Sequence, residues 1–255
     1  MEFDFVEIFI LSAIQGISEF LPISSSAHLF LISEIKSFGS QSIFIDIGLH
    51  LGSLLSIIIY FRKELVNILQ DKSLLFLLVA GSIPLIIVGA ITYYSGLIYY
   101  FRNIETVAYV TLIFAFFLYL ADKFEVKKKI SKDLTIKSIC IIGIFQALAV
   151  IPGVSRSGIV ITASRFLNFS RYDSTKISFF LSIPAIIGAS ILIAKDLFKE
   201  DIKFNLALIL SIILSFLFSY ISIKYFLIFV QKFSLNIFVI YRIILSIILF
   251  IIIYN

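Results

Sequence analysis

The sequence predicts an all-α polytopic integral membrane protein with six transmembrane helices and two oppositely oriented re-entrant helical hairpins. Hydrophobic residues make up 60% of its 255 residues and charged residues only 15%, whereas soluble domains carry about 25% charged residues. Uncharged runs at 73–101, 177–194 and 204–223 each reach the roughly 18–20 residues that cross a bilayer. These runs are too continuous for a soluble core, so we expect one membrane domain over residues 1–255.

Prolines and charged loops divide the chain into ten expected helical segments. They cover residues 5–21, 23–36, 43–61, 73–95, 104–121, 138–151, 156–168, 173–194, 204–223 and 233–254. Four of them form two pairs of short helices that meet at Pro22 and at Pro152. Proline lacks a backbone donor and pushes the preceding residue out of the helical region, so each pair predicts a re-entrant hairpin. The other six segments can span, with kinks expected at Pro84 and Pro184.

Loop charges predict the orientation. The loop 121–137 contains six lysines and only three acidic residues, which places it on the cytoplasmic side. When the spans are counted in both directions from this loop, the first hairpin enters from outside and the second from the cytoplasm. Each hairpin is followed by three spanning helices. We therefore expect a 3+3 inverted repeat, about 1–121 and 138–255, joined by the basic loop 122–137. In such a fold the half-helix N-termini meet near the midplane and suit an anion.

Several function classes are disfavoured. The net charge of +5 is spread over membrane-flanking loops, so no nucleic-acid partner is expected. A single cysteine, Cys140, excludes an internal disulfide and a cysteine-based zinc cluster. The acidic N-terminus, with Glu2, Asp4 and Glu7, argues against a cleaved signal peptide. Motifs of P-loop, zincin and dinucleotide-binding proteins are absent from the sequence.

Two polar stretches, 15–28 and 146–158, interrupt the apolar sequence and share their spacing. Gln15 precedes Ser24 by nine residues, and Gln146 precedes Ser155 by nine. A charged group at mid-depth costs roughly 2.5–3.5 kcal/mol, so Glu19 and Arg156 are expected to have a role.

The residue types in these stretches favour phosphate chemistry. Gln15 and Glu19 lie four residues apart on one helix face. Three serines, Ser24, Ser25 and Ser26, follow the first break, and His28 lies on the next helical turn; Ser155, Arg156 and Ser157 follow the second break. Arginine binds phosphate oxygens through two parallel donors. A glutamate can hold a divalent cation or act as a base, and serine or histidine can attack or transfer a proton.

Structural alternatives apply to the same residues. The serines after each proline could be ordinary helix caps, and Arg156 could simply neutralise Glu19 with no ligand. Gln15 and Gln146 could bond to irregular backbone, most of all Gln146. We expect His50 to form a buried packing pair with Asp46, and Arg242 to be a structural anchor or a snorkelling side chain.

The two stretches resemble the undecaprenyl-diphosphate phosphatases of the bacitracin-resistance (BacA) type. That family has an [E/Q]-x-x-x-E motif followed by P-x-S-S-[ST]-x-H, and a second motif P-G-x-S-R-S-G, matched here by 15–28 and 152–158. The resemblance extends to the stretches 49–55, 178–184 and 240–242, and so to nearly the whole chain. The type-2 phosphatidic acid phosphatases do not fit, because they need a second histidine after the Ser-Arg element and none follows His50.

The resemblance implies roles for individual residues. Glu19 would be the essential carboxylate with Gln15, which is Glu in most of the family, as its companion at a divalent cation, Mg²⁺ or Ca²⁺. Ser25, His28 and Arg156 would complete the catalytic pocket. The diphosphate would be bound by the remaining hydroxyls and the arginine, namely Ser24, Ser26, Ser155, Arg156 and Ser157.

The resemblance also implies a setting. The substrate would be undecaprenyl diphosphate in the bacterial cytoplasmic membrane, with the pocket open to the outer side and a homodimer as one compatible state. The product, undecaprenyl phosphate, carries envelope glycans. The attacking group stays open among Ser25, His28 and metal-activated water. The rival hypothesis is a polyprenyl-phosphate flippase using the same midplane site; a committed carboxylate and nucleophile favour the enzyme.

Overall fold

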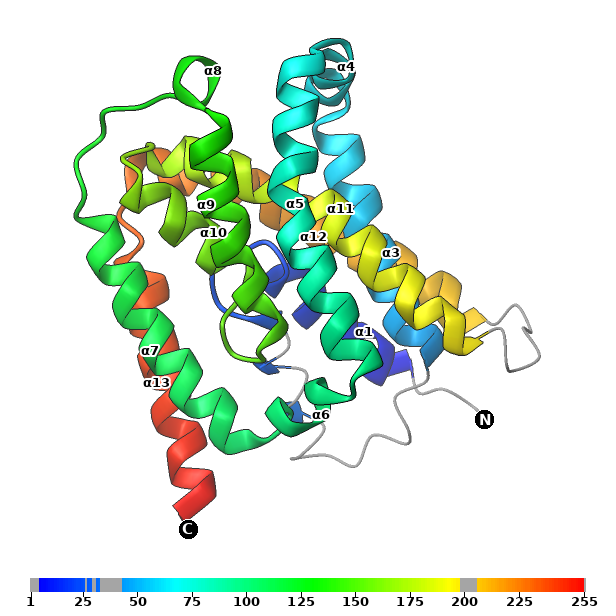
Figure 1. The fold of residues 1–255 in the computed structure, drawn as a ribbon. Helices are drawn as coiled ribbons and strands as arrows, with labels where there is room; N and C mark the ends of the chain where they lie inside the picture. The colour runs from blue at the N-terminus through cyan, green and yellow to red at the C-terminus, as the bar shows by residue number, and fades with distance from the viewer. Residues whose placement is uncertain (1–4, 26, 29–30, 33–42, 198–205, 255) are drawn as a thin grey trace.

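The computed structural model describes residues 5–25, 27–28, 31–32, 43–197 and 206–254. Every regular element in these ranges is helical, apart from one isolated bridge between Lys128 and Phe169 (Figure 1). The elements are α1 (Phe5–Ser18), α3 (Ile43–Tyr60), α4 (Arg62–Gln70), α5 (Lys72–Tyr94), α6 (Leu97–Phe101), α7 (Ile104–Asp122), α8 (Ile130–Asp133), α9 (Ile136–Ala147), the 3₁₀ turn η1 (Leu148–Val150), α10 (Arg156–Phe166), α11 (Arg171–Leu197), α12 (Leu206–Lys232) and α13 (Asn236–Tyr254). The all-helical prediction is confirmed for this part of the chain.

Five of the described helices are long and apolar enough to cross a membrane: α5, α7, α11, α12 and α13. A sixth span results if α3 and α4, which are bent by 76° at Phe61, count as one. By contrast, α1 and the stretch from α9 through η1 are short apolar helices, as expected for half-length elements. The chain is therefore a multi-pass membrane protein.

The second pair of short helices, α9 and α10, forms a hairpin whose two outer ends lie at the same end of the molecule. The backbone N–H groups of Lys127 and Lys128, which precede α9, donate to the carbonyl of Asn168, which follows α10, at 3.0 and 3.1 Å. The turn between η1 and α10 contains Pro152, where the hairpin was predicted to break. The corresponding end of the first pair falls in the predicted helix 23–36, of which residues 26, 29–30 and 33–36 lie outside the described residues.

Some boundaries differ from those predicted. Predicted helix 204–223 was ended before Lys224, but α12 continues to Lys232; residues 225–230 are again apolar, and a long lysine stem allows its charge to reach the membrane surface. The expected loop after residue 61 contains α4. In the first hairpin α1 ends at Ser18, and residues 19–23 form the turn. The break thus begins before Pro22, because the proline ring clashes with the carbonyl four residues earlier, that of Ser18, and cannot donate a hydrogen bond to it.

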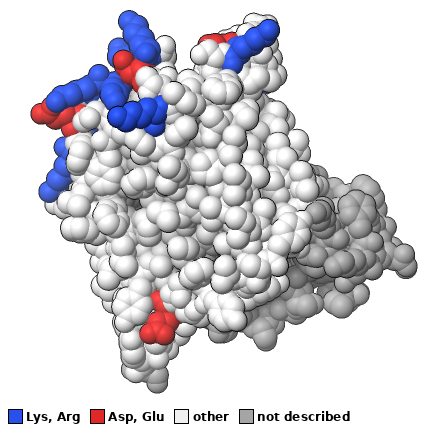
Figure 2. Space-filling view, viewed as in Figure 1, with Lys and Arg blue, Asp and Glu red and all other residues white. Residues whose placement is uncertain are grey.

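Basic residues gather at the end of the molecule that carries α4 and α8 (Figure 2). An ion pair between Lys176 and Glu64 joins the start of α11 to α4, and Arg171 pairs with Asp122 at the end of α7. The three basic segments 62–72, 122–137 and 165–176 therefore share one end, as the loop counting requires. The side of the membrane on which this end lies stays a prediction.

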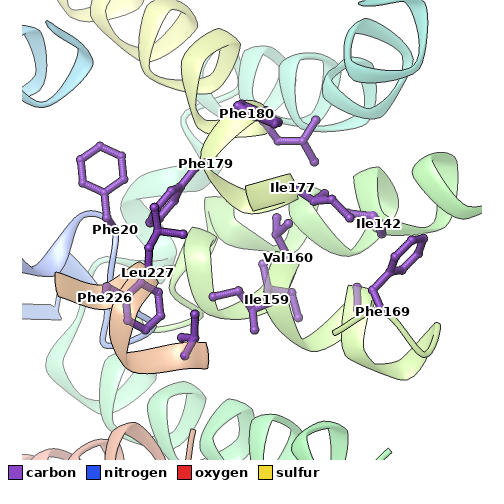
Figure 3. Packing of buried hydrophobic residues seen from close by; sticks show 14 of the residues in the cluster. Phe20, Ile142, Ile159, Val160, Phe169, Ile177, Phe179, Phe180, Phe226 and Leu227 are labelled. Carbon is purple, nitrogen blue, oxygen red and sulfur yellow. The ribbon is translucent and has the colours of Figure 1, made fainter. Parts of the chain in front are cut away.

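The largest apolar cluster surrounds α10 (Figure 3). Ile159 and Val160 of α10 belong to this cluster, and Phe20 of the first hairpin packs edge-on against Phe179 of α11 with ring centroids 5.4 Å apart. Within a bilayer such contacts stabilise by close packing and not by exclusion of water. The cluster thus fixes both hairpins against α11.

Small residues bring α1 and α3 close to α12. A methyl group at Gly52 would lie 2.4 Å from the carbonyl oxygen of Ile212, and one at Gly16 would lie 2.6 Å from Cβ of Phe218. The hydroxyl of Ser53 contacts those of Ser215 and Ser219 at 3.1 and 3.0 Å. Such small-residue contacts with interhelical hydrogen bonds are typical of membrane bundles.

Candidate active site

The two hairpin turns end in the same backbone conformation. Ser24 and Ser155 have φ values of +73° and +67°, in a region that non-glycine residues seldom occupy. Ser155 then caps α10 by accepting the N–H of Gly158 at 3.2 Å. The nine-residue spacing from each glutamine therefore leads to matching strained serines. Strain of this kind concentrates at functional sites.

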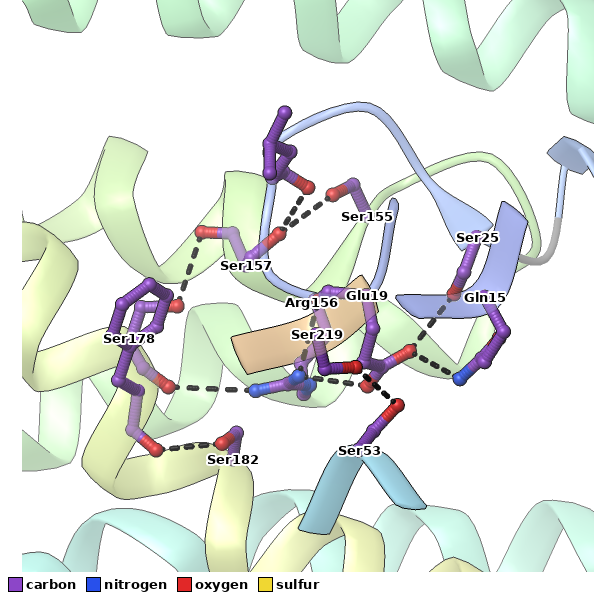
Figure 4. Close-up of polar contacts among 12 residues, drawn as sticks. Gln15, Glu19, Ser25, Ser53, Ser155, Arg156, Ser157, Ser178, Ser182 and Ser219 are labelled. Carbon is purple, nitrogen blue, oxygen red and sulfur yellow. Dashed lines mark hydrogen bonds and ion pairs between the residues drawn. The ribbon is translucent and has the colours of Figure 1, made fainter. Parts of the chain in front are cut away.

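Glu19 and Arg156 connect the two hairpins through a nearly buried ion pair (Figure 4). Glu19 Oε1 lies 2.8 Å from Arg156 Nη2, and the exposed fractions of the two side chains are 9% and 13%. The same guanidinium donates to the carbonyls of Glu19 at 3.3 Å and of Ser178 at 3.4 Å. The arginine thus has several acceptors around it, so its place is fixed even if the carboxylate is exchanged for another anion.

The other carboxylate oxygen of Glu19 is bound by groups of the first hairpin. Gln15 Nε2 and Ser25 Oγ both donate to Glu19 Oε2, each at 3.0 Å. A hydroxyl that donates to a buried carboxylate is arranged like a nucleophile beside its base. The structure therefore brings together four of the predicted site residues: Gln15, Glu19, Ser25 and Arg156.

A serine of the second hairpin, Ser157, joins the two hairpins. Ser157 Oγ donates to the carbonyl of Leu21 at 2.6 Å and lies 3.2 Å from Ser155 Oγ. Ser24 and Ser157 are each 2% exposed, so both side chains are buried. Ser26, the remaining predicted diphosphate ligand, lies outside the described residues.

His28 is held by partners other than Glu19. Its Nδ1 lies 2.6 Å from the carbonyl oxygen of Ser24, and its Nε2 lies 2.5 Å from the hydroxyl of Tyr241. Because a carbonyl only accepts, Nδ1 carries the proton and Nε2 accepts the tyrosine hydroxyl. The His28 and Tyr241 rings are also stacked, with centroids 5.6 Å apart. Tyr241 was not predicted to have a role from the sequence, although the adjacent Arg242 was predicted to be a structural anchor.

Arg242 of α13 anchors both hairpin breaks. It is fully buried and donates to the carbonyls of Gly153 at 2.8 Å and Val154 at 3.1 Å, and to that of Pro22 at 3.5 Å. Its Nε reaches the carbonyl of Thr111 at 3.4 Å. Irregular backbone at membrane depth needs such donors. The expectation of a structural anchor is confirmed, and snorkelling is excluded by the burial.

The expected pair of His50 and Asp46 is present, but it is half-buried and formed through the main chain: His50 Nδ1 bonds to the backbone carbonyl of Asp46 at 2.8 Å. One other expectation needs correction. Gln146 was expected to bond to irregular backbone, but both polar atoms of its buried side chain have no partner in the part of the chain described. The backbone here satisfies itself, since the N–H of Leu148 reaches the carbonyls of Gln146 and Phe145.

The residues present fit a divalent cation bound mainly by substrate and water. Among the described residues no three His, Cys, Asp or Glu side chains are grouped for a metal. Glu19 supplies one carboxylate, and the buried Oε1 of Gln15 has no hydrogen-bond partner. Mg²⁺ commonly binds through one or two carboxylates together with waters and substrate phosphates. Glu19 meets that requirement with one carboxylate, and Gln15 Oε1 adds an amide oxygen.

Comparisons with known proteins agree with this geometry. Residues 8–248 match the family of the bacitracin resistance protein BacA. An undecaprenyl-diphosphatase of Pelagibacter ubique is 56% identical over 251 residues, which cover 98% of each chain. Undecaprenyl-diphosphatases of Elusimicrobium minutum and Campylobacter curvus are 43% and 40% identical, covering 95% of both chains in the first case and 96% of this chain and 98% of the relative in the second. The chain therefore belongs to the BacA family of bacterial membrane proteins.

Proposed function

We propose that the protein is an undecaprenyl-diphosphatase, which hydrolyses undecaprenyl diphosphate to undecaprenyl phosphate and inorganic phosphate. The observation that carries this proposal is the joining of Ser25, Glu19 and Arg156 across the two hairpins. A hydroxyl, a base and a phosphate-binding guanidinium are the groups that phosphoryl transfer needs. Its relatives with 40–56% identity are named for the same activity. Returning the carrier lipid to use would also confer resistance to bacitracin.

Substrate binding would exchange one partner of Arg156. Its guanidinium now makes one short contact with Glu19 Oε1. A phosphate group can replace that carboxylate and accept two parallel N–H bonds from the arginine. The exchange frees the carboxylate while the contact of Arg156 Nη1 with the Ser178 carbonyl still orients the arginine. Charge balance is kept because the diphosphate replaces the anion that the arginine loses.

Ser25 is the attacking group that the hydrogen bonds favour. Its Oγ would attack the terminal phosphorus as its proton passes to Glu19, and the bond from that phosphorus to the bridging oxygen would break. Protonated Glu19 would then give its proton to the departing undecaprenyl phosphate. Water would next attack the phosphoserine, with Glu19 accepting its proton and returning one to Ser25, which releases phosphate. His28 is committed to Ser24 and Tyr241 and would position the second half-helix.

A divalent cation would be held by Glu19 and Gln15 Oε1. When bound, it supplies positive charge that neutralises the diphosphate oxygens. The requirement for it can be tested by removal with EDTA and replacement with Mg²⁺ or Ca²⁺.

The finer architecture is part of the proposal. An inverted repeat would explain why two hairpins share a nine-residue spacing and matching positive φ values. The site would lie near the midplane and open to the outer face, where carrier lipid is released after glycan transfer.

The decisive experiment is phosphate release from undecaprenyl and farnesyl diphosphates by detergent-purified protein, with and without EDTA. We expect release that EDTA abolishes and Mg²⁺ or Ca²⁺ restores. Lipid movement across vesicles without phosphate release would support the flippase and contradict the enzyme. Rapid acid quenching should trap phosphate on Ser25; full turnover by Ser25→Ala would exclude that nucleophile.

A further inference from the structure

A polar pocket of about 540 Å³ lies at the basic end of the molecule. None of its lining residues belongs to the two hairpin breaks. Its walls come from the end of α7, the loop that follows it, the turn between α10 and α11, and the end of α12. Three candidate membrane spans, Ile104–Asp122, Arg171–Leu192 and Leu206–Lys232, end at this pocket. The pocket therefore lies at the level where spanning helices leave the hydrocarbon.

The charged groups in this pocket do not balance. Two guanidinium groups, of Arg165 and Arg171, face one carboxylate, that of Asp122, so the wall carries one excess positive charge. Asp122 is fully engaged, since Arg171 Nε and Nη2 donate to it at 2.5 and 2.9 Å and the N–H of Leu235 at 3.0 Å. Its Oδ1 remains 4.0 Å from Arg165 Nε, beyond hydrogen-bond distance.

Arg165 is the arginine of this pocket with a hydrogen-bond donor left over. Its side chain is 2% exposed, and its Nη atoms donate to the carbonyls of Phe169, Asp122 and Phe124. Its Nε has no hydrogen-bond partner in the described part of the chain. The carbonyls satisfy the Nη donors but supply no negative charge, and a buried donor without a hydrogen bond is costly. The carboxylate of Asp173, at the start of α11, accepts from Ser170.

The rim of the pocket is apolar and exposed. Phe124 and Val126 line it with exposed fractions of 44% and 60%, and Tyr172 lies beside them. An excess positive charge with an apolar rim, at the level of the lipid headgroups, matches a phosphate ester attached to acyl chains. Basic pockets between spanning helices are known to bind such headgroups.

We propose that this pocket binds the phosphodiester headgroup of an anionic membrane lipid, at a site separate from the hairpin site. The phosphate would interact with the Arg165 and Arg171 guanidinium groups, and the glycerol end of the lipid would lie on Phe124 and Val126. Such a lipid would hold together the ends of α7, α11 and α12 and thereby stabilise the fold. The binding is independent of catalysis.

The test uses full-length protein in neutral detergent and measures thermal unfolding and lipid binding by native mass spectrometry. Three additions are compared: phosphatidylglycerol, phosphatidylcholine and inorganic phosphate. We expect phosphatidylglycerol alone to raise the unfolding temperature and to remain bound. Equal stabilisation by inorganic phosphate would identify a free-anion site and overturn the lipid assignment, and no preference over phosphatidylcholine would overturn the site.

A matched pair of variants locates the effect. Gln231 is exposed on α12 and lines the pocket, so Gln231→Glu adds a negative charge without touching the buried groups. Gln70→Glu makes the same change at an exposed position of α4, at the same end of the molecule. We expect the affinity of phosphatidylglycerol for Gln231→Glu to fall by about tenfold or more, because like charges repel strongly near a protein surface. Its affinity for Gln70→Glu should equal that for the wild type. Equal binding to both variants would refute the assignment to this pocket.

Discussion

Replacing Arg156 by lysine keeps the charge of the candidate site but removes its geometry. Arginine bonds to Glu19 through one terminal nitrogen and to the Ser178 carbonyl through the other. A single ammonium cannot reach both and cannot hold two phosphate oxygens in one plane. Losing one group that stabilises charge in the transition state costs about 2.7–4 kcal/mol, or about 10²–10³ in rate. We therefore expect kcat of Arg156→Lys to fall by about 10² or more.

The assay is phosphate release from undecaprenyl diphosphate by purified protein, with thermal unfolding measured on the same sample. Because lysine still neutralises Glu19, the unfolding temperature should change little. Arg156→Gln serves as the contrast, since it leaves a buried carboxylate without its cation and should cost about 3–5 kcal/mol of stability. A lysine variant with nearly wild-type kcat would show that Arg156 is only a counter-ion for Glu19 and would refute the reasoning.

Two further changes concern the residues that support the site. Tyr241→Phe removes the hydroxyl bound to His28 but keeps the stacked ring; we expect a loss of about 1 kcal/mol in stability and a fall in kcat of about tenfold or less, measured by thermal unfolding and phosphate release. Arg242→Lys cannot reach the carbonyls of both Gly153 and Pro22, so the unfolding free energy should fall by about 2–4 kcal/mol. An Arg242→Lys protein as stable as wild type would contradict the anchoring of the two breaks.

The sequence predicted that the polar residues of the two hairpins come together, because each group of them is marked by a local pattern. Prolines 22 and 152 mark the two breaks, and the polar groups beside them are conspicuous in an apolar chain. Glu19 and Arg156 lie 137 residues apart, yet each is costly in hydrocarbon alone. That cost indicated that each needs a partner, and the structure supplies it by pairing them.

The partners of the supporting residues were less predictable because they lie far away in the sequence and give no periodic signal. Tyr241 lies 213 residues from His28, and Arg242 lies 220 residues from Pro22. The end of α12 was misplaced because Lys224 reads as a loop charge, although a lysine can extend along a helix to the membrane surface. Gln146 was expected to bond to the irregular backbone, but the backbone after it forms its own hydrogen bonds, and no carboxylate lies four residues after it, as Glu19 does after Gln15.

The most direct test of the central claim is Glu19→Gln, which preserves the shape of the side chain and removes its charge. The amide oxygen can still accept from Arg156, so the account predicts a folded protein whose phosphate release falls by about 10² or more. Excess Mg²⁺ or Ca²⁺ should restore little of it, because the base for Ser25 is lost as well as a cation ligand. A well-folded Glu19→Gln protein that hydrolyses undecaprenyl diphosphate at nearly the wild-type rate would contradict the account.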